Sequence, residues 1–77
     1  MAKLPVTSAR KVLRALSRLG FHEVRQRGSH IVLVNEETRR EVVVPNHPEL
    51  DRGTLKSILK QAGISVDQLL EVLVLLR

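Results

Sequence analysis

Apolar residues near the start of the chain recur at intervals of three and four. This spacing places them on one side of a helix, and the residues concerned are Ala9, Val12, Leu13, Leu16 and Leu19. Thr7 or Ser8 can cap such a helix, and Gly20 can end it. The pattern therefore predicts a helix from about Ser8 to Leu19 with one face in the core.

The middle of the chain carries three short runs that are typical of strands, at residues 21–27, 30–35 and 40–44. Gly28-Ser29 forms a turn between the first two runs, and polar residues 36–39 join the second to the third, so we predict an antiparallel sheet. The second and third runs are nearly continuous in apolar residues, whereas a sheet with one solvated face alternates. We therefore expect the second face of the sheet to be covered by the C-terminal segment or by another chain.

The second half of the chain begins with a loop, because Pro45 and Pro48 remove backbone donors there. Asp51 is a good cap for a helix from about residue 52 to 62, and Gly63 ends it. The core face of this helix is predicted to carry Leu55, Ile58, Leu59 and Ala62.

A last helix is indicated by Ser65 and Gln68, which have the spacing of a capping box. From Leu69 to Leu76 this helix is apolar nearly all round, and such a helix is not left in water. We expect it either to cover the open sheet face or to meet a second subunit, which would make a homodimer.

The order of elements is α-β-β-β-α with an additional C-terminal helix. We predict an α+β fold in which residues 1–77 form a single domain and residues 65–77 form the extra helix. Helices packed on one face of an antiparallel sheet are the layout of the double-stranded-RNA-binding domain, which reads A-form RNA by shape and phosphate.

Composition adds a charge argument. The chain of 77 residues has a formal net charge of +5, and Phe21 is its only aromatic residue. The surplus favours an anionic partner, such as nucleic acid, an acidic membrane or an acidic protein, although it can also serve solubility alone. Because single-strand binders stack bases on aromatic side chains, we expect any nucleic acid here to be held by its backbone or its helix shape.

The chain has no cysteine, so it forms no disulfide and offers no thiolate to a metal. Its N-terminus lacks an apolar segment of signal-peptide length, and its most apolar stretch is too short to span a bilayer. We therefore expect a soluble cytoplasmic protein without membrane contact.

Cations follow one side of the first predicted helix. Arg10, Arg14 and Arg18 recur every four residues with Lys11 beside them, and no acidic residue interrupts the helix. They are a candidate phosphate track, and an ordinary solvated face is the alternative. Lys56 and Lys60 on the second helix either extend this track or are solvated.

The stretch from Arg25 to His30 combines charge, a tight turn and a titratable group. Gly28 permits a positive φ, and the amides of the turn with Ser29 can hold a phosphate. Arg25 and Arg27 are placed to stabilise negative charge, and His30 can exchange a proton near neutral pH. RNA cleaves itself when its 2′-hydroxyl loses a proton and attacks the adjacent phosphorus, so these residues suit RNA cleavage. An exposed histidine without a role is the alternative for His30.

The other two histidines are weaker candidates. We interpret His47 as a residue that fixes its loop through a hydrogen bond, with a second acid or base as the alternative, and His22 as a surface residue. The spacing of the three histidines matches no common ligand pattern, so no metal site is predicted.

Five segments of the chain, in order, carry a resemblance to a known family. The segments are Lys3-Leu4-Pro5, Gly20-Phe21, Arg25-Gln26-x-Gly28-Ser29-His30, Val44-Pro45-x-His47 and Gly53-Thr54-Leu55-x-x-Ile58-Leu59-Lys60-Gln61-Ala62-Gly63. Together they resemble the HicA-type toxins, also called YcfA-like proteins, of toxin–antitoxin pairs.

This resemblance implies a fold like the double-stranded-RNA-binding domain and an mRNA interferase activity that arrests growth. It implies a HicB-type antitoxin as partner and places the family's catalytic histidine on His30. Our reading is a metal-independent endoribonuclease without a cofactor. The alternatives are a non-catalytic RNA-binding module and a protein-interaction domain.

Overall fold

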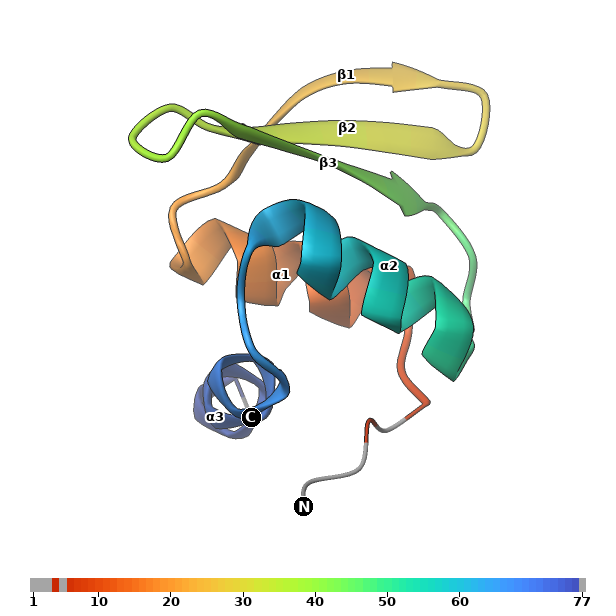
Figure 1. Cartoon of the computed structure of the whole chain (residues 1–77). Coiled ribbons are helices and arrows are strands. Elements are labelled where there is room, and N and C mark those ends of the chain that lie inside the picture. Colours follow the sequence, from red (N-terminus) through yellow and green to blue (C-terminus); the bar gives the residue numbers. More distant parts are fainter. Residues whose placement is uncertain (1–3, 5, 77) are drawn as a thin grey trace.

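Helices and strands follow one another in the predicted order in the computed structural model, which describes residue 4 and residues 6–76 (Figure 1). The elements are α1 (Ala9–Arg18), β1 (His22–Arg27), β2 (His30–Asn35), β3 (Arg40–Pro45), α2 (Arg52–Ala62) and α3 (Val66–Leu75). Lys3 and Pro5 of the first matching segment, and Arg77 at the end of the extra helix, lie outside the described residues. The predicted α+β fold, like the double-stranded-RNA-binding domain, is confirmed.

The helices start at the residues that local chemistry selects. The side chain of Ser8 accepts a hydrogen bond from the Lys11 amide, and that of Asp51 accepts one from the Thr54 amide at 2.7 Å. This bond lowers the pKa of Asp51, because it stabilises the charged carboxylate. Ser65 and Gln68 form the predicted capping box at α3. Of the two caps considered for α1, Ser8 is the one used.

The sheet is antiparallel with β2 in its centre. At one end His30 lies opposite Arg27 on β1 and Pro45 on β3, and at the other end Asn35 lies opposite Arg40. The β1 strand is shorter than predicted by one residue, since Phe21 precedes it as a buried core residue. A bulge between Glu23 and Arg25 shifts the register, which explains why the apolar pattern of β1 does not alternate.

One face of the sheet, here called the inner face, packs on the helices. Its core residues are Ile31, Leu33, Val42 and Val44, and they join the buried faces of α1 and α2. The predicted core face of α2 is buried in full. This helix lies along β3, where the side-chain oxygen of Gln61 accepts the free amide of Val43 at 2.9 Å.

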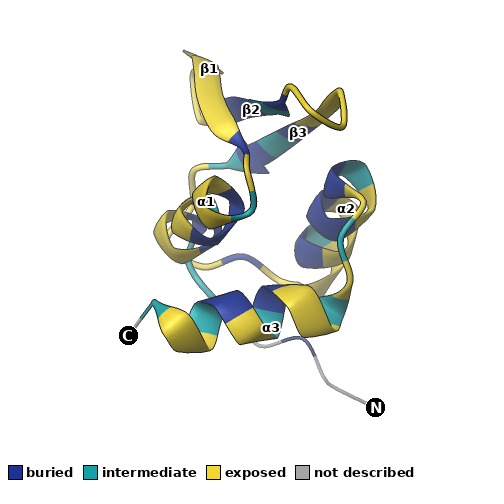
Figure 2. Ribbon diagram, turned by 90° about the vertical axis from the view of Figure 1, so that its left-hand side faces the viewer, coloured by how far each residue is buried: buried dark blue, intermediate teal, exposed yellow. Residues whose placement is uncertain are grey.

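The last helix does not cover the sheet. α3 lies below α1 and α2, on the side away from the strands, and packs against α1 (Figures 1 and 2). Its residues Leu69 and Val72 are buried there. The expectation that the C-terminal segment closes the open sheet face is therefore wrong, because the helical layer also has an apolar underside and α3 covers that instead.

The outer face of the sheet, which points away from the helices, has no second layer within the described residues. Val32 on this face is nevertheless only 7% exposed. In the register of the strands it lies between Arg25 and Val43, whose side chains share the face. The continuous apolar pattern of β2 thus reflects shielding by neighbours within the sheet.

One polar side chain is buried at the far end of the sheet. Asn35 is 8% exposed, and its Nδ2 donates to the Leu19 carbonyl while its Oδ1 accepts the amides of Glu37 and Thr38. Gly20 lies against it, because a Cβ at Gly20 would approach the Asn35 amide nitrogen to 3.1 Å. Asn35 therefore ties the end of α1 to the loop after β2.

Candidate active site

His30 lies at the exposed tip of the β1–β2 hairpin. It alternates along β2 with the core residues Ile31 and Leu33, so it belongs to the outer face. Arg27 is its direct cross-strand neighbour, and Arg25 is the next residue of β1 on that face. The structure thus brings together three of the predicted site residues, and we call them the outer-face site.

The turn that carries His30 has two central residues, Gly28 and Ser29. Gly28 has a φ of +55°, as predicted, and Ser29 is not among the residues with positive φ. This combination is that of a type II′ hairpin turn. A Cβ on Gly28 would meet nothing within 4 Å, so this side of the turn is open to a ligand.

Both carbonyl groups of the turn are held by neighbouring groups. The side-chain amide of Gln26 donates to the Gly28 carbonyl at 3.1 Å. The backbone amide of Asn46, in the loop after β3, donates to the Ser29 carbonyl. The hairpin tip is therefore fastened both to its own strand and to the β3–α2 loop.

His47 continues this connection through its main chain. Its amide donates to the Pro45 carbonyl at 2.9 Å, and its carbonyl accepts the Ala9 amide at 3.0 Å. The loop is thus fixed by hydrogen bonds of the His47 backbone, which link it to the start of α1, while the residue itself is exposed. The structure places His47 on the loop that supports the turn.

The helical cations do not form one track. Arg10, Lys11, Arg14 and Arg18 are exposed on α1, and Lys56 and Lys60 are exposed on α2. The two helices lie side by side under the sheet with their buried sides facing each other and their exposed sides on opposite flanks (Figure 2). Within the described residues none of these cations has an ion pair, so both groups are free to meet an anion, but on separate flanks.

His22 lies on the outer face at the other end of the strand pair. It is exposed, as predicted for a surface residue, and its Nε2 is 3.3 Å from Glu36. Across residues 4 and 6–76, no three His, Cys, Asp or Glu side chains gather in a group that could hold a metal ion.

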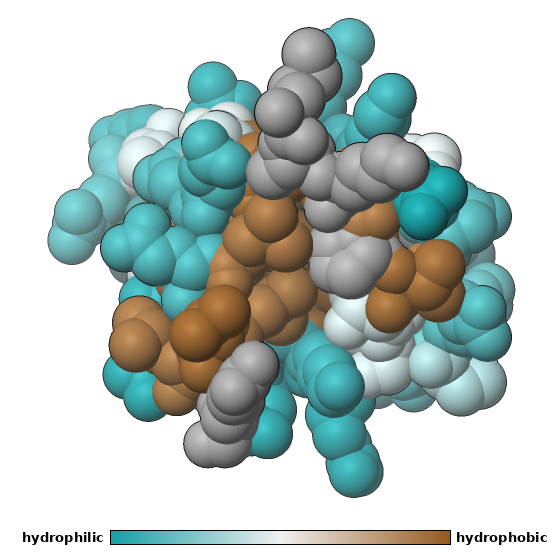
Figure 3. Space-filling model, turned by 90° about the horizontal axis from the view of Figure 1, so that it is seen from below, coloured by the Kyte–Doolittle hydropathy of each residue, from teal (hydrophilic) through white to brown (hydrophobic). Residues whose placement is uncertain are grey.

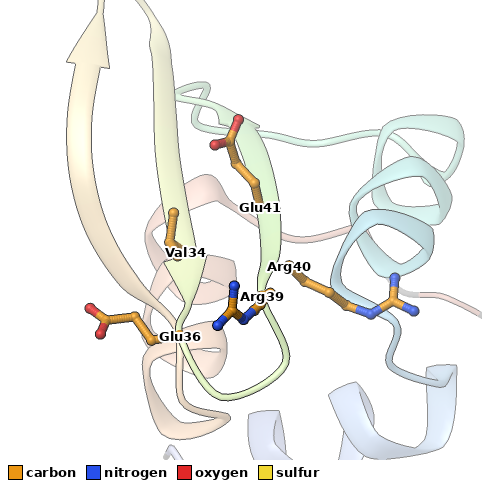
Figure 4. Close-up of a pocket in the computed structure, with 5 residues that line it drawn as sticks. All are labelled: Val34, Glu36, Arg39, Arg40 and Glu41. Atoms are coloured by element: carbon orange, nitrogen blue, oxygen red, sulfur yellow. The ribbon is translucent and has the colours of Figure 1, made fainter.

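Hollows lie both near the predicted site residues and away from them. One is lined by residues of the α1 start and the β3–α2 loop, among them Lys11 and Glu49, and has a volume of about 410 Å³. A second lies at the opposite end of the sheet from His30 and mixes charges of both signs, from Glu36, Arg39 and Glu41 (Figure 4). The mixed charge makes the second hollow a poor phosphate site.

Sequence reasoning assigned no role to Gln26, Asn35 or Asn46. Gln26 stands two residues before the turn glycine, a spacing that can signal a side chain folded back on the turn. Asn35 precedes a polar loop, which is where Asx turns begin. Asn46 acts through its backbone, so its sequence identity carries no signal.

The α3 side of the molecule carries an apolar area. Figure 3 views this side and shows brown apolar side chains bordered by hydrophilic ones. Val74 and Leu75 on α3 are 58% and 67% exposed. A homodimer through this helix stays a prediction.

None of the helices in the described part of the chain has the length and apolarity that crossing a membrane requires.

Comparison with known proteins assigns the chain to a family. The comparison with curated proteins gives no match. Residues 9–64 match the family described as HicA toxin of bacterial toxin-antitoxin. The match runs from the start of α1 to just after α2 and leaves α3 outside it. The chain therefore belongs to the HicA toxin family, the toxin half of a pair whose other half is an antitoxin.

Proposed function

We propose that this toxin is an endoribonuclease that cleaves mRNA without a metal ion and so blocks translation. The observation that carries the proposal is the position of His30, which shares the exposed outer face of the hairpin tip with Arg27 and Arg25. A proton-transfer group and two cations thus lie where a phosphodiester can approach without displacing any part of the fold.

The reaction needs a proton removed from the 2′-hydroxyl and a proton given to the leaving 5′-oxygen. The 2′-oxygen forms a bond to phosphorus as the bond to the 5′-oxygen breaks, which leaves a 2′,3′-cyclic phosphate and a free 5′-hydroxyl. His30 carries one of these transfers, as base or as acid. Arg25 and Arg27 stabilise the charge that gathers on the phosphate oxygens.

RNA binding draws on a wider surface than catalysis. Ser29 and Gly28 contact the scissile phosphate, and the α1 cations attract the flanking backbone from the neighbouring flank. Lys56 and Lys60 contribute only to RNA long enough to reach the far side. His47 acts on the site through the loop that it anchors.

The test is cleavage of RNA by the purified chain, with and without EDTA, beside His30→Ala. We expect the variant to cleave about 10²–10⁴-fold more slowly, the range for a lost acid or base, and to keep its RNA affinity. His22→Ala is the matched control, since His22 is an exposed histidine on the same face at the far end of the sheet. It should cleave like the unmodified protein.

Other outcomes point to the rival functions. Cleavage that is unaffected in His30→Ala would place the chemistry elsewhere, and cleavage lost in EDTA would show that a metal takes part. RNA that is retarded on a gel but never shortened would indicate a binding module. No RNA affinity at physiological salt would favour a surface made only for a protein partner.

A further inference from the structure

The two central residues of the turn, Gly28 and Ser29, have an unequal set of backbone hydrogen bonds. The Gly28 carbonyl accepts from Gln26, and the Ser29 carbonyl accepts from Asn46. The amides of Gly28 and Ser29, by contrast, have no acceptor among the described residues. The tip therefore presents donors to solvent while its acceptors are occupied, which is the polarity that an anion needs.

The direction of one of these donors, the Ser29 amide, follows from the bond made by Gln26. Gln26 lies opposite Ile31, a core residue, so its side chain starts from the inner face of the sheet. The Gly28 carbonyl is drawn toward that side. Because a trans peptide is planar and its C=O and N–H point in opposite directions, the Ser29 amide is then turned toward the outer face, where His30 and Arg27 lie.

We infer that Gln26 is a positioning residue: its hydrogen bond fixes the Gly28–Ser29 peptide so that the Ser29 amide donates to the phosphate held beside His30. This inference rests on the proposed function for its substrate. It adds to the site a residue, Gln26, that does not contact RNA itself but sets the direction of the Ser29 amide, which does.

The competing turn geometry shows what the bond prevents. A flip of the Gly28–Ser29 peptide gives a type I′ turn, which needs a positive φ at both central residues. Ser29 resists this change, because a left-handed conformation is unfavourable for a residue with a side chain. In the flipped form the Gly28 carbonyl would face the phosphate and repel it. Ser29 and Gln26 thus hold the same peptide orientation by independent means.

The experiment observes the backbone amides of the full chain by NMR while a DNA oligonucleotide is added. DNA keeps the phosphodiester but lacks the 2′-hydroxyl, so it cannot be cleaved by the proposed route. We expect the Ser29 amide signal to shift strongly. The amides of Glu37 and Thr38 are internal references whose signals should not shift, because they already donate hydrogen bonds to the Asn35 side chain.

Gln26→Met removes the donor and keeps a side chain of similar length. We expect the Ser29 response to fall to less than half, and kcat for RNA to fall about 2–10-fold, the effect of one lost hydrogen bond, with little change in KM. Ser29→Gly should also weaken the response, because glycine admits the flipped turn. Glu23→Gln is the control on the same strand and face, and it should keep the full response. The dispersed amide spectrum of each variant verifies that it is folded.

The outcomes separate this inference from the nuclease proposal. A Ser29 response in Gln26→Met equal to that of the unmodified chain overturns the inference, even if His30→Ala abolishes cleavage. If the unmodified chain never cleaves RNA, but the Ser29 response is present and depends on Gln26, the nuclease proposal fails and the positioning of the amide is supported.

Discussion

The two loops that join the strands of the sheet differ in which backbone groups they leave free. In the β1–β2 turn both carbonyls are bonded, to Gln26 and to Asn46, and neither central amide has an acceptor in the described part of the chain. In the loop of residues 36–39, between β2 and β3, the Asn35 side chain accepts the amides of Glu37 and Thr38. The first loop leaves its amide donors available to a ligand, whereas the amide donors of the second loop are bonded to the Asn35 side chain.

The charges around the two loops differ in the same sense. Arg25 and Arg27 lead into the first turn, and the register places Arg27 opposite His30 and Arg25 opposite Val32, on the same face. Around the second loop, Arg39 and Arg40 line a hollow together with Glu36 and Glu41, so both signs of charge are present (Figure 4). Exposure alone does not separate the loops, since both lie at open ends of one sheet. The free donors and the unbalanced positive charge identify the first loop as the candidate site.

The largest change in stability is expected from a substitution in the β2–β3 loop, whose amides are bonded to Asn35. Asn35→Ala leaves the Leu19 carbonyl and two loop amides without their partner, and we expect the free energy of unfolding to fall by about 2 kcal/mol. Urea denaturation measures this loss.

Gln26→Met is the matched comparison, because it also deletes one side-chain amide beside a loop. Its bond is exposed, and we expect little loss of stability. An equal loss in the two variants would contradict the division of the loops into a structural one and a functional one.

The next effect, smaller in free energy than that of Asn35→Ala, concerns activity and compares one arginine substitution near each loop. Arg27→Gln removes a cation beside His30, and we expect RNA cleavage to fall about tenfold, since stabilisation of transition-state charge is lost at an exposed site. Arg39→Gln removes an arginine that is also exposed, from the other loop, and should leave the rate unchanged. Initial rates at matched ionic strength make the comparison. Equal losses would mean that only the net charge of the protein matters.

The elements of the fold could be predicted closely because each was marked locally. Ser8, Asp51 and Ser65 cap the helices, and the Gly28-Ser29 turn sets the hairpin. The position of α3 could not be predicted, because an apolar helix fits any uncovered apolar surface. The choice between the sheet and the helical layer depends on how α1 and α2 pack, which no local pattern encodes.

The candidate site was predicted only in part for the same reason. The run from Arg25 to His30 is contiguous, so the sequence already placed its cations near His30. Whether the cations of α2 extend the track on α1 was left open by the sequence, and the structure places the exposed sides of the two helices on opposite flanks (Figure 2). The roles of Gln26 and Asn46 depend on which carbonyls they reach, and that is a property of the folded chain.

The smallest effect tests the backbone of the two loops. Arg39 has a φ of +59°, whereas the first turn uses Gly28 at +55°. A left-handed conformation costs a residue with a side chain about 1 kcal/mol or more. A glycine at this position avoids that cost, but it loses more conformational entropy on folding, which offsets part of the gain. We therefore expect Arg39→Gly to raise the free energy of unfolding by about 0.5 kcal/mol. Arg39→Ala, which removes the charge but keeps a Cβ, should bring no such gain.

Gly28→Ala is the reverse experiment. A Cβ at Gly28 meets no neighbour within 4 Å, so only the backbone conformation opposes it, and we expect a loss of about 1 kcal/mol. Opposite signs for Arg39→Gly and Gly28→Ala in urea denaturation would show that both loops need a left-handed residue and that only the first has the residue suited to it. Equal signs would mean that side-chain interactions of Arg39 outweigh its backbone strain.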